Sequence, residues 1–281
     1  MGHVPADVWA KVAPLLTRVD REVPIVIWKD GSFDELANLH PEPEKAITFT
    51  EADKLRLQDN KNVLVLLHNH PSGNPEPSDA DSAGQMAMGV PWGVCAVQSA
   101  YMSPVGATEG YRIPTGISPP ECWGDDVEIP PLVGRSYLWQ VRDCFTLVRD
   151  YYRLQGISLP NAARSRSPGF YPLSDARSRP FTKWAPLCGF EAINWRDRKP
   201  GDTIVMEFPD YGDPHRVNWP REEPNHCAIY FGEGKYLHQL RDHPSDYWTP
   251  KNEDLLPTNL KAIVYRLKVK NARSRRPLRG S

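Results

Sequence analysis

The chain has 281 residues, and 34 Lys and Arg side chains nearly balance 35 Asp and Glu side chains. This balance offers no strongly basic surface, so we expect no nucleic-acid partner. No window approaches 18 uninterrupted apolar residues and the first residues lack the pattern of a secretory signal, so we expect neither a membrane span nor a signal peptide. Five cysteines, an odd number without zinc-finger spacing, argue against a disulfide framework.

The length predicts two domains, each large enough for its own core. A stretch rich in Pro and Gly, residues 115–133, is typical of a linker. It separates a predicted N-terminal domain at residues 1–114 from a C-terminal domain at residues 134–270. Residues 271–281 form a basic tail, for which a solvated, disordered end is the simplest interpretation.

The first half mixes helical and strand patterns. Apolar residues at helical spacing predict a helix within residues 5–19, and residues 51–58 predict another. Strands are predicted at residues 23–28, 94–97 and 110–113. This mixture predicts an α/β domain built around a mixed sheet.

The most specific motif of the N-terminal half surrounds His68 and His70. The apolar run at residues 63–67 predicts a buried strand, and the two histidines follow at its exit, two residues apart and hence on one face. Pro and Gly then interrupt regular structure, after which Ser78 has the form of a helix N-cap with Asp81 in the first turn. Two imidazoles and one carboxylate give three ligands, the number typical of a catalytic zinc site.

His68, His70, Ser78 and Asp81 together resemble the JAMM (or MPN) metallopeptidase signature, His-x-His, seven residues, Ser, two residues, Asp. The resemblance implies that both histidines and Asp81 bind Zn²⁺, which lowers the pKa of a bound water to about 7. It implies that Ser78 donates a hydrogen bond to the oxyanion. The alternative is a degenerate copy of the motif that no longer binds metal.

The JAMM family also uses a glutamate as general base at the junction of the first helix and first strand, which is the place of Glu22. The family often has a glycine a few residues later, whereas this chain continues Val-Pro-Ile-Val. A surface salt bridge is the alternative for Glu22 and for each of its competitors. Those competitors are Glu35, Glu42, Glu44 and Glu51.

A second pattern opens a predicted helix in the C-terminal half. Asp143 is a candidate N-cap, so Cys144 lies at the helix N-terminus. There the helix dipole stabilises a thiolate, and the backbone N–H can help to bind an oxyanion. A buried structural cysteine is the alternative. The residues expected on the buried face of the helix are Leu147, Val148, Tyr151 and Leu154.

Residues 225–238 predict a strand, a Gly-x-Gly turn and a second strand that folds back beside the first. The turn lets His226 and His238 meet across the hairpin. A cysteine nucleophile, a histidine base and a polar group that orients this base are the parts of a cysteine peptidase. Cys227 follows His226 on the same strand, so it should face the opposite way and lie in the core.

Landmarks of one peptidase family recur along this half, namely Asp143-Cys144, Gly156-Ile157, Pro200-Gly201-Asp202, Asn225-His226 and His238. They resemble NlpC-type cysteine peptidases, the papain-like cell-wall hydrolases. The resemblance implies an α+β domain with an N-terminal helix packed on an antiparallel sheet. It implies that Cys144 is the nucleophile, His226 the base and His238 the orienting residue. Most relatives have Ser-Gly after the Asp-Cys pair, where this chain has Phe145 and Thr146.

The order of the two halves resembles the tail-tip assembly proteins of lambdoid phages. This resemblance implies a virion protein at the tail tip, made in the host cytoplasm, with other tail-tip proteins as partners. It implies action on the cell wall in the periplasm, with the D-γ-glutamyl–diamino acid amide of the peptidoglycan stem peptide as substrate. Two alternatives stay open: an isopeptidase acting on a protein substrate, and a structural tail-tip component whose sites are inactive.

Overall fold

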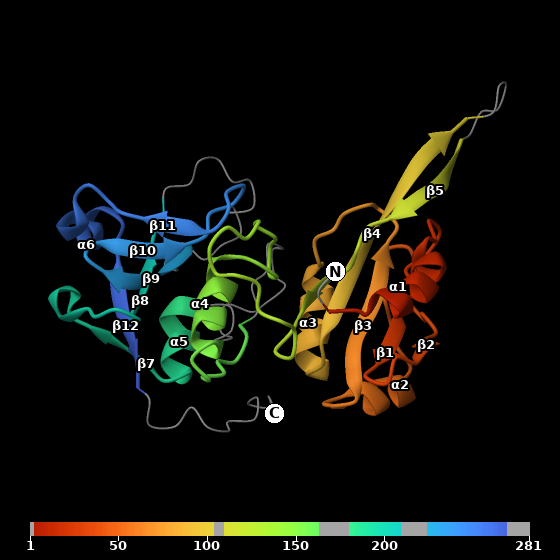
Figure 1. The fold of residues 1–281 in the computed structure, drawn as a ribbon, viewed down its shortest axis with the longest axis horizontal. Helices are drawn as coiled ribbons and strands as arrows, with labels where there is room; N and C mark the ends of the chain where they lie inside the picture. The colour runs from red at the N-terminus through yellow and green to blue at the C-terminus, as the bar shows by residue number, and fades with distance from the viewer. Residues whose placement is uncertain (1–2, 104–109, 163–179, 209–223, 269–281) are drawn as a thin grey trace. The chain divides into compact units, whose positions relative to one another are not determined.

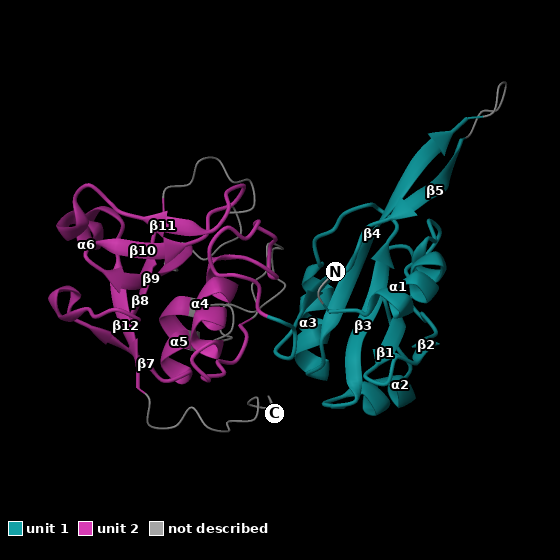
Figure 2. Ribbon diagram, in the orientation of Figure 1, with its two compact units in different colours: residues 1–128 teal, residues 129–281 magenta. Residues whose placement is uncertain are grey.

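The computed structural model describes residues 3–103, 110–162, 180–208 and 224–268 (Figure 1). The predicted basic tail, residues 271–281, lies outside this part of the chain. The chain divides into two compact units, Met1–Glu128 and Ile129–Ser281 (Figure 2). Within the described residues, every helix is too short or too polar to cross a membrane.

The first unit is built on a mixed sheet, which confirms the predicted fold class. Its strands lie in the order β2-β1-β3-β4-β5, and β6 also pairs with β4. β3 and β4 are parallel and are joined through a helix, whereas the other pairs are antiparallel. The strands are β1 (Ile25–Trp28), β2 (Phe33–Glu35), β3 (Val63–His70), β4 (Trp92–Met102), β5 (Tyr111–Ile117) and β6 (Glu121–Trp123).

The helices of this unit are α1 (Ala6–Val12), α2 (Glu51–Leu57) and α3 (Asp79–Met88). The first helix is shorter than the predicted span of residues 5–19, and a 3-10 turn, Ala13–Leu16, replaces its C-terminal part. Pro14 accounts for this change because it cannot donate the next α-helical hydrogen bond. Val8 and Val12 pack with Ile25 and Val65, so α1 covers the β1 and β3 part of the sheet.

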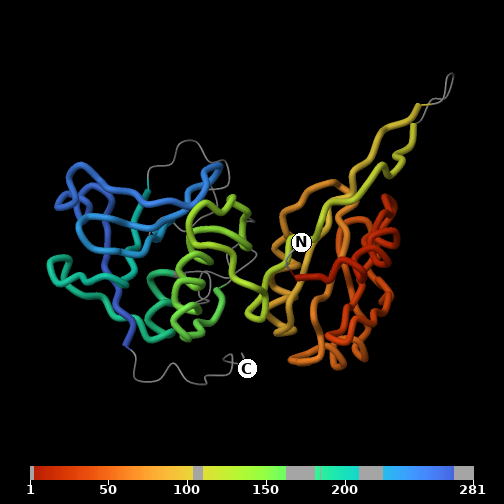
Figure 3. The backbone as a smooth tube through the Cα atoms, in the orientation of Figure 1, coloured from red at the N-terminus to blue at the C-terminus, as the bar shows by residue number. Residues whose placement is uncertain are grey.

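The first unit extends further along the chain than the sequence predicts. β4 continues to Met102 and pairs with β5 as a hairpin that extends beyond the rest of the sheet (Figure 3). Part of β5 and all of β6 lie within residues 115–133, the predicted linker, and the two units divide after Glu128. Short, largely exposed strands bury little apolar surface, so composition alone resembles a linker.

The second unit is an antiparallel sheet, in the order β11-β10-β9-β8-β12-β7, with α4 (Cys144–Arg153) packed on β9. This arrangement confirms the predicted helix-on-sheet architecture. The strands are β7 (Phe190–Ile193), β8 (Thr203–Met206), β9 (His226–Gly232), β10 (Lys235–His238), β11 (Asp246–Trp248) and β12 (Ile263–Leu267). Two short α-helices, α5 (Ala185–Leu187) and α6 (Leu256–Asn259), complete the described elements named in Figure 1.

The predicted buried face of α4 is correct at Leu147 and Val148, only half-buried at Tyr151, and wrong at Leu154. Leu147 and Val148 are buried in the core with Ile229 of β9. Leu154 is 61% exposed, because α4 ends at Arg153 and Leu154 is its C-cap residue. Tyr152 is the buried residue of the last turn, and its hydroxyl donates to the Gly201 carbonyl at 2.8 Å.

Replacing Leu147 with Ala should destabilise the second unit by about 2–5 kcal/mol, because it leaves a cavity between α4 and the sheet. Urea denaturation followed by tryptophan fluorescence would measure the loss. Leu154→Ala is the matched control on the same helix and should cost no more than about 0.5 kcal/mol. Equal losses for the two variants would contradict the assigned packing.

Candidate active sites

The two histidines of the first unit lie within β3, which runs through them rather than ending before them. Both side chains are buried and share one face of the strand. Their Nε2 atoms are 3.2 Å apart. The Nδ1 atom of His70 donates to the Asn74 carbonyl at 2.9 Å, so the Nε2 lone pair of a neutral His70 faces His68.

Asp81 approaches the same point from the start of α3. Its carboxylate oxygens lie 3.2 Å from Nε2 of His68 and 3.3 Å from Nε2 of His70. Burial would raise the pKa of Asp81, but the two histidines outweigh burial and hold it well below its ordinary value. The structure therefore brings together the three side chains that the sequence assigns to metal binding.

The spacing of these three residues fits a tetrahedral metal ion. Zinc–ligand bonds of about 2.0–2.1 Å place the ligand atoms of a tetrahedron about 3.3 Å apart. The two Nε2 atoms lie 3.2 Å apart, and Asp81 brings Oδ1 to 3.2 Å from His68 and Oδ2 to 3.3 Å from His70. Two neutral imidazoles and a carboxylate are also the donor types that zinc accepts. The residues present therefore fit Zn²⁺.

Glu22 lies beside this cluster. Its Oε1 atom is 4.0 Å from Nε2 of His70, farther than the oxygens of Asp81, and its Oε2 atom is buried without a hydrogen-bond partner in the described chain. Ligand atoms of Glu22, His68 and His70 fall within 4.8 Å of one another, but the shorter distances favour Asp81 as the third ligand. Glu22 is placed as a neighbour of such a site.

Burial raises the pKa of Glu22 to about 7, while His70 opposes this shift and Asp81 adds to it. A carboxyl group with this pKa can take up and release a proton near neutral pH. The competing glutamates differ from Glu22 because all four are exposed, and two of them form surface ion pairs with lysines. The competitors are Glu35, Glu42, Glu44 and Glu51.

Two asparagines hold Glu22 in place, and sequence reasoning missed both. Asn69, the middle residue of the His-x-His motif, accepts a hydrogen bond from the Val23 N–H at 2.6 Å and donates to the Arg21 carbonyl at 3.0 Å. Asn38 donates to the Glu22 carbonyl at 3.0 Å. The available signal was the strand period, which turns Asn69 away from the histidines and toward the chain before β1.

Ser78 contacts Asp81 in this structure. Its hydroxyl donates to a carboxylate oxygen of Asp81 at 2.7 Å and accepts from the Asp81 N–H at 3.1 Å, which forms the capping box of α3. This box fixes the Asp81 carboxylate at the helix start. The oxyanion role of Ser78 stays a prediction.

The second site begins at the N-terminus of α4. Asp143 is the N-cap and accepts from the Thr146 N–H at 2.8 Å, so Cys144 is the first helical residue. A hydrogen bond from Cys227 has the largest effect on the thiol, and together with His226 it lowers the pKa of Cys144 well below its usual value despite burial. These two contacts therefore favour the thiolate form of Cys144.

His226 and His238 form a hydrogen-bonded pair across the β9–β10 hairpin. Nε2 of His226 lies 3.1 Å from Nδ1 of His238, and the rings are nearly perpendicular. Burial and the neighbouring His226 lower the pKa of His238 to about 4. A neutral His238 accepts a hydrogen bond at Nδ1 from the Nε2–H of His226, which leaves the other ring nitrogen of His226 for the Cys144 thiol.

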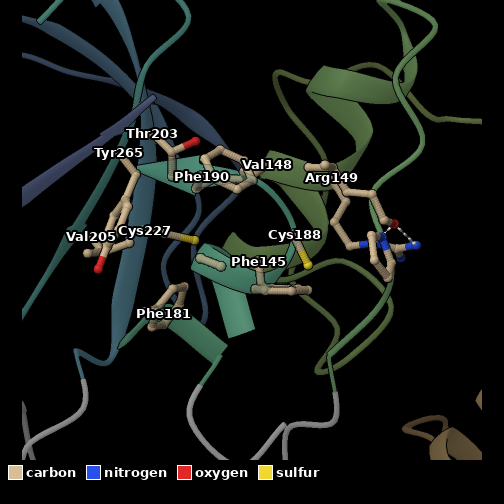
Figure 4. A pocket seen from close by; sticks show the side chains of 13 residues that line it. Phe145, Val148, Arg149, Phe181, Cys188, Phe190, Thr203, Val205, Cys227 and Tyr265 are labelled. Carbon is tan, nitrogen blue, oxygen red and sulfur yellow. Dashed lines mark hydrogen bonds between the residues drawn. The ribbon is translucent and has the colours of Figure 1, made fainter. Parts of the chain in front are cut away.

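Cys227 lies in the core, as the sequence predicts, but its thiol also reaches Cys144. It lines a pocket between α4 and the sheet together with Phe145 and Cys188 (Figure 4). The lining is mostly aromatic and aliphatic, which suits apolar groups rather than a polar peptide. This pocket therefore lies next to the Cys144 segment, and its apolar lining does not suit a polar ligand.

Comparisons with known proteins agree with these two sites. Residues 134–255 match the model of the NlpC/P60 family, and this span contains Cys144, His226 and His238. Residues 46–88 match the model of the RadC-like JAB domain, a span that contains the metal-binding motif but not Glu22. The chain is also 26% identical over 213 residues to tail tip assembly protein K of Escherichia phage lambda, covering 72% of this chain and 85% of that protein.

Two solved structures also show similarity. One is an NLP/P60 family protein similar to lipoprotein from Staphylococcus aureus, with 15% identity, a TM-score of 0.30 and coverage of 48% of this chain and 37% of that one. The other is an NlpC/P60 family protein from Bacillus cereus, with 14% identity, a TM-score of 0.27 and coverage of 80% and 73%.

Replacing Cys227 with Ala should slow alkylation of Cys144 by iodoacetamide at pH 6 by about tenfold, because a hydrogen bond to the thiolate is lost. Mass spectrometry of the modified peptide would measure the rate at Cys144. Cys227→Ser keeps a hydrogen-bond donor and should retain most of the rate. Cys188→Ala, in the same pocket, is the control. An unchanged rate in Cys227→Ala would exclude the assigned hydrogen bond.

Proposed function

We propose that this chain is a phage tail-tip protein that hydrolyses peptidoglycan peptides through Cys144 and carries a second, zinc-dependent peptidase site. The proposal depends on two successive contacts. Cys144, at the start of α4, contacts His226, and His226 is hydrogen-bonded to His238. The NlpC/P60 match over this region and the similarity to a tail tip assembly protein support it.

In the proposed cysteine reaction, the Cys144 thiolate attacks the carbonyl carbon of a stem-peptide amide. Backbone N–H groups at the start of α4 stabilise the oxyanion that forms. His226, held by His238, then donates its proton to the leaving amine and a thioester remains. Water deprotonated by His226 hydrolyses the thioester and regenerates the thiol. The expected bond is the D-γ-glutamyl–diamino acid amide of the stem peptide.

In the first unit, His68, His70 and Asp81 would hold Zn²⁺. The ion supplies a bound water of lowered pKa and an electrophile for an amide carbonyl. Glu22 would move a proton toward the leaving amine, and its pKa of about 7 suits this role. Ser78 would donate to the oxyanion after its hydroxyl turns from Asp81.

The proposed location follows from the relative at the tail tip of phage lambda. Other tail-tip proteins are the expected partners in the virion and, during assembly, in the host cytoplasm. Peptidoglycan lies in the periplasm, so the cysteine site would act there. The substrate of the zinc site would be either a peptidoglycan peptide or a protein of the tail.

Purified muropeptides should be cleaved by the wild type and by His68→Ala, but Cys144→Ala should lose at least about 1,000-fold in rate because it lacks the nucleophile. Liquid chromatography with mass spectrometry would identify the products. Cys188→Ala is the matched cysteine control. Full cleavage by Cys144→Ala would contradict the assigned nucleophile and would leave the zinc site as the source of activity.

The wild type should bind one zinc ion per chain, measured by atomic emission after dialysis. His68→Ala and Asp81→Asn should each weaken binding by at least about 100-fold, because each removes one of three protein ligands. His40→Ala, whose ring contacts the backbone of Glu42, should bind zinc as the wild type does. Equal zinc content in all four proteins would exclude this site.

A further inference from the structure

Two aromatic side chains enclose the histidine pair of the second unit, and the proposed reaction gives them no role. The ring of Phe208 lies 5.0 Å from the ring of His226 and 6.1 Å from that of His238. Trp248 of β11 stacks on His238 with ring centroids 5.7 Å apart and an interplanar angle of 25°. Phe208 and Trp248 also contact each other edge to face at 5.7 Å. We call these two residues the aromatic enclosure.

Asn225 fixes one wall of the aromatic enclosure. Its Oδ1 atom accepts from the Phe208 N–H at 2.7 Å, and its Nδ2 atom donates to the Phe208 carbonyl at 3.0 Å. An amide satisfies both backbone groups at once, whereas a carboxylate offers only an acceptor and a hydroxyl is too short to make both bonds. Asn225 directly precedes His226, so two consecutive residues supply the proposed base and the side chain that holds Phe208 in place.

We propose that Asn225 and the aromatic enclosure are positioning residues that hold His226 and His238 in their hydrogen-bonded geometry. The inference rests on the proposed cysteine peptidase function, which it deepens. Phe208 limits rotation of both rings, and Trp248 limits rotation of His238. A base misplaced by about 1 Å can lose 100-fold in rate, so this restraint matters for proton transfer.

The aromatic enclosure also bears on the protonation state of His238, because burial lowers the pKa of this ring. The titratable groups facing this ring are His226 on β9, Asp246 on β11 and His243 in the turn between β10 and β11. Asp246 favours the charged ring, whereas burial and both histidines oppose it, which gives the pKa of about 4. Once protonated, His238 can no longer accept a hydrogen bond from His226, so the pair loses this orientation at pH values below the pKa of His238.

Opening the aromatic enclosure should therefore raise the pH below which His238 becomes protonated and the reaction slows. Phe208→Leu keeps an apolar side chain but removes the ring, and Asn225→Ala releases Phe208 from both hydrogen bonds. Water then reaches His238, burial lowers its pKa less, and protonation begins closer to the ordinary value of about 6.5. A change in packing alone would alter stability without this shift in protonation.

The test is a titration of the His238 ring by ¹H–¹⁵N NMR in the full chain, for the wild type, Phe208→Leu and Asn225→Ala. We expect a midpoint near pH 4 in the wild type and an increase of one to two pH units in each variant. With muropeptides as substrate, kcat should fall about 10- to 100-fold in both variants, while KM changes less than about threefold. Phe208→Tyr keeps the ring and should restore the wild-type behaviour.

Phe231→Leu and Asn194→Ala are the matched controls, because Phe231 packs on Tyr151 and Tyr247 and Asn194 caps a 3-10 turn. Both should leave the titration and the kcat unchanged. An unchanged His238 midpoint in Phe208→Leu and Asn225→Ala would overturn the inference. The titration needs no substrate, so a wild type that fails to cleave muropeptides would refute the proposed function while the role of the enclosure is still decided.

Discussion

The contact between the first turn of α4 and the start of β9 is the constraint on which the second unit depends. Packing of Leu147 and Val148 against the sheet fixes the helix, and Asp143 fixes where the helix begins. Cys144 is thereby held at the positive end of the helix dipole, within hydrogen-bonding reach of His226 and Cys227. The hydrogen bonds from Cys227 and His226 lower the pKa of Cys144, and the packing of α4 on the sheet keeps these partners in place.

In the first unit, too, the positions of a strand and a helix start bring the candidate site residues together. A strand supplies two imidazoles from one face, and the capping box of the following helix supplies the carboxylate. The residue that fixes the helix start is thus also the residue whose carboxylate contacts His68, so the helix cap and the proposed metal site constrain the same side chain. Both sites place their chemistry at the junction of a strand and the N-terminus of a helix.

Local patterns predicted much of this arrangement. The strand period placed His68 and His70 together, and the capping pattern placed Asp81 and Cys144 at helix starts. Local patterns could not predict contacts between residues that are distant in the chain. Asn38 and Asn69 hold Glu22 through backbone groups, which requires knowledge of how the segment before β1 folds over β3. The hydrogen bond from Cys227 was missed for the same reason, since strand alternation describes faces and not the helix that covers them.

The most direct test of the account is the pH dependence of the Cys144 thiolate, measured by absorbance at 240 nm or by the rate of alkylation, in the wild type and in His226→Ala. The account predicts that the wild-type thiolate persists well below the pKa of about 8.5 of a free cysteine, and that loss of His226 moves the titration toward that value. An ordinary thiol titration in the wild type would contradict the central claim that hydrogen bonds from Cys227 and His226 activate this cysteine at the start of α4.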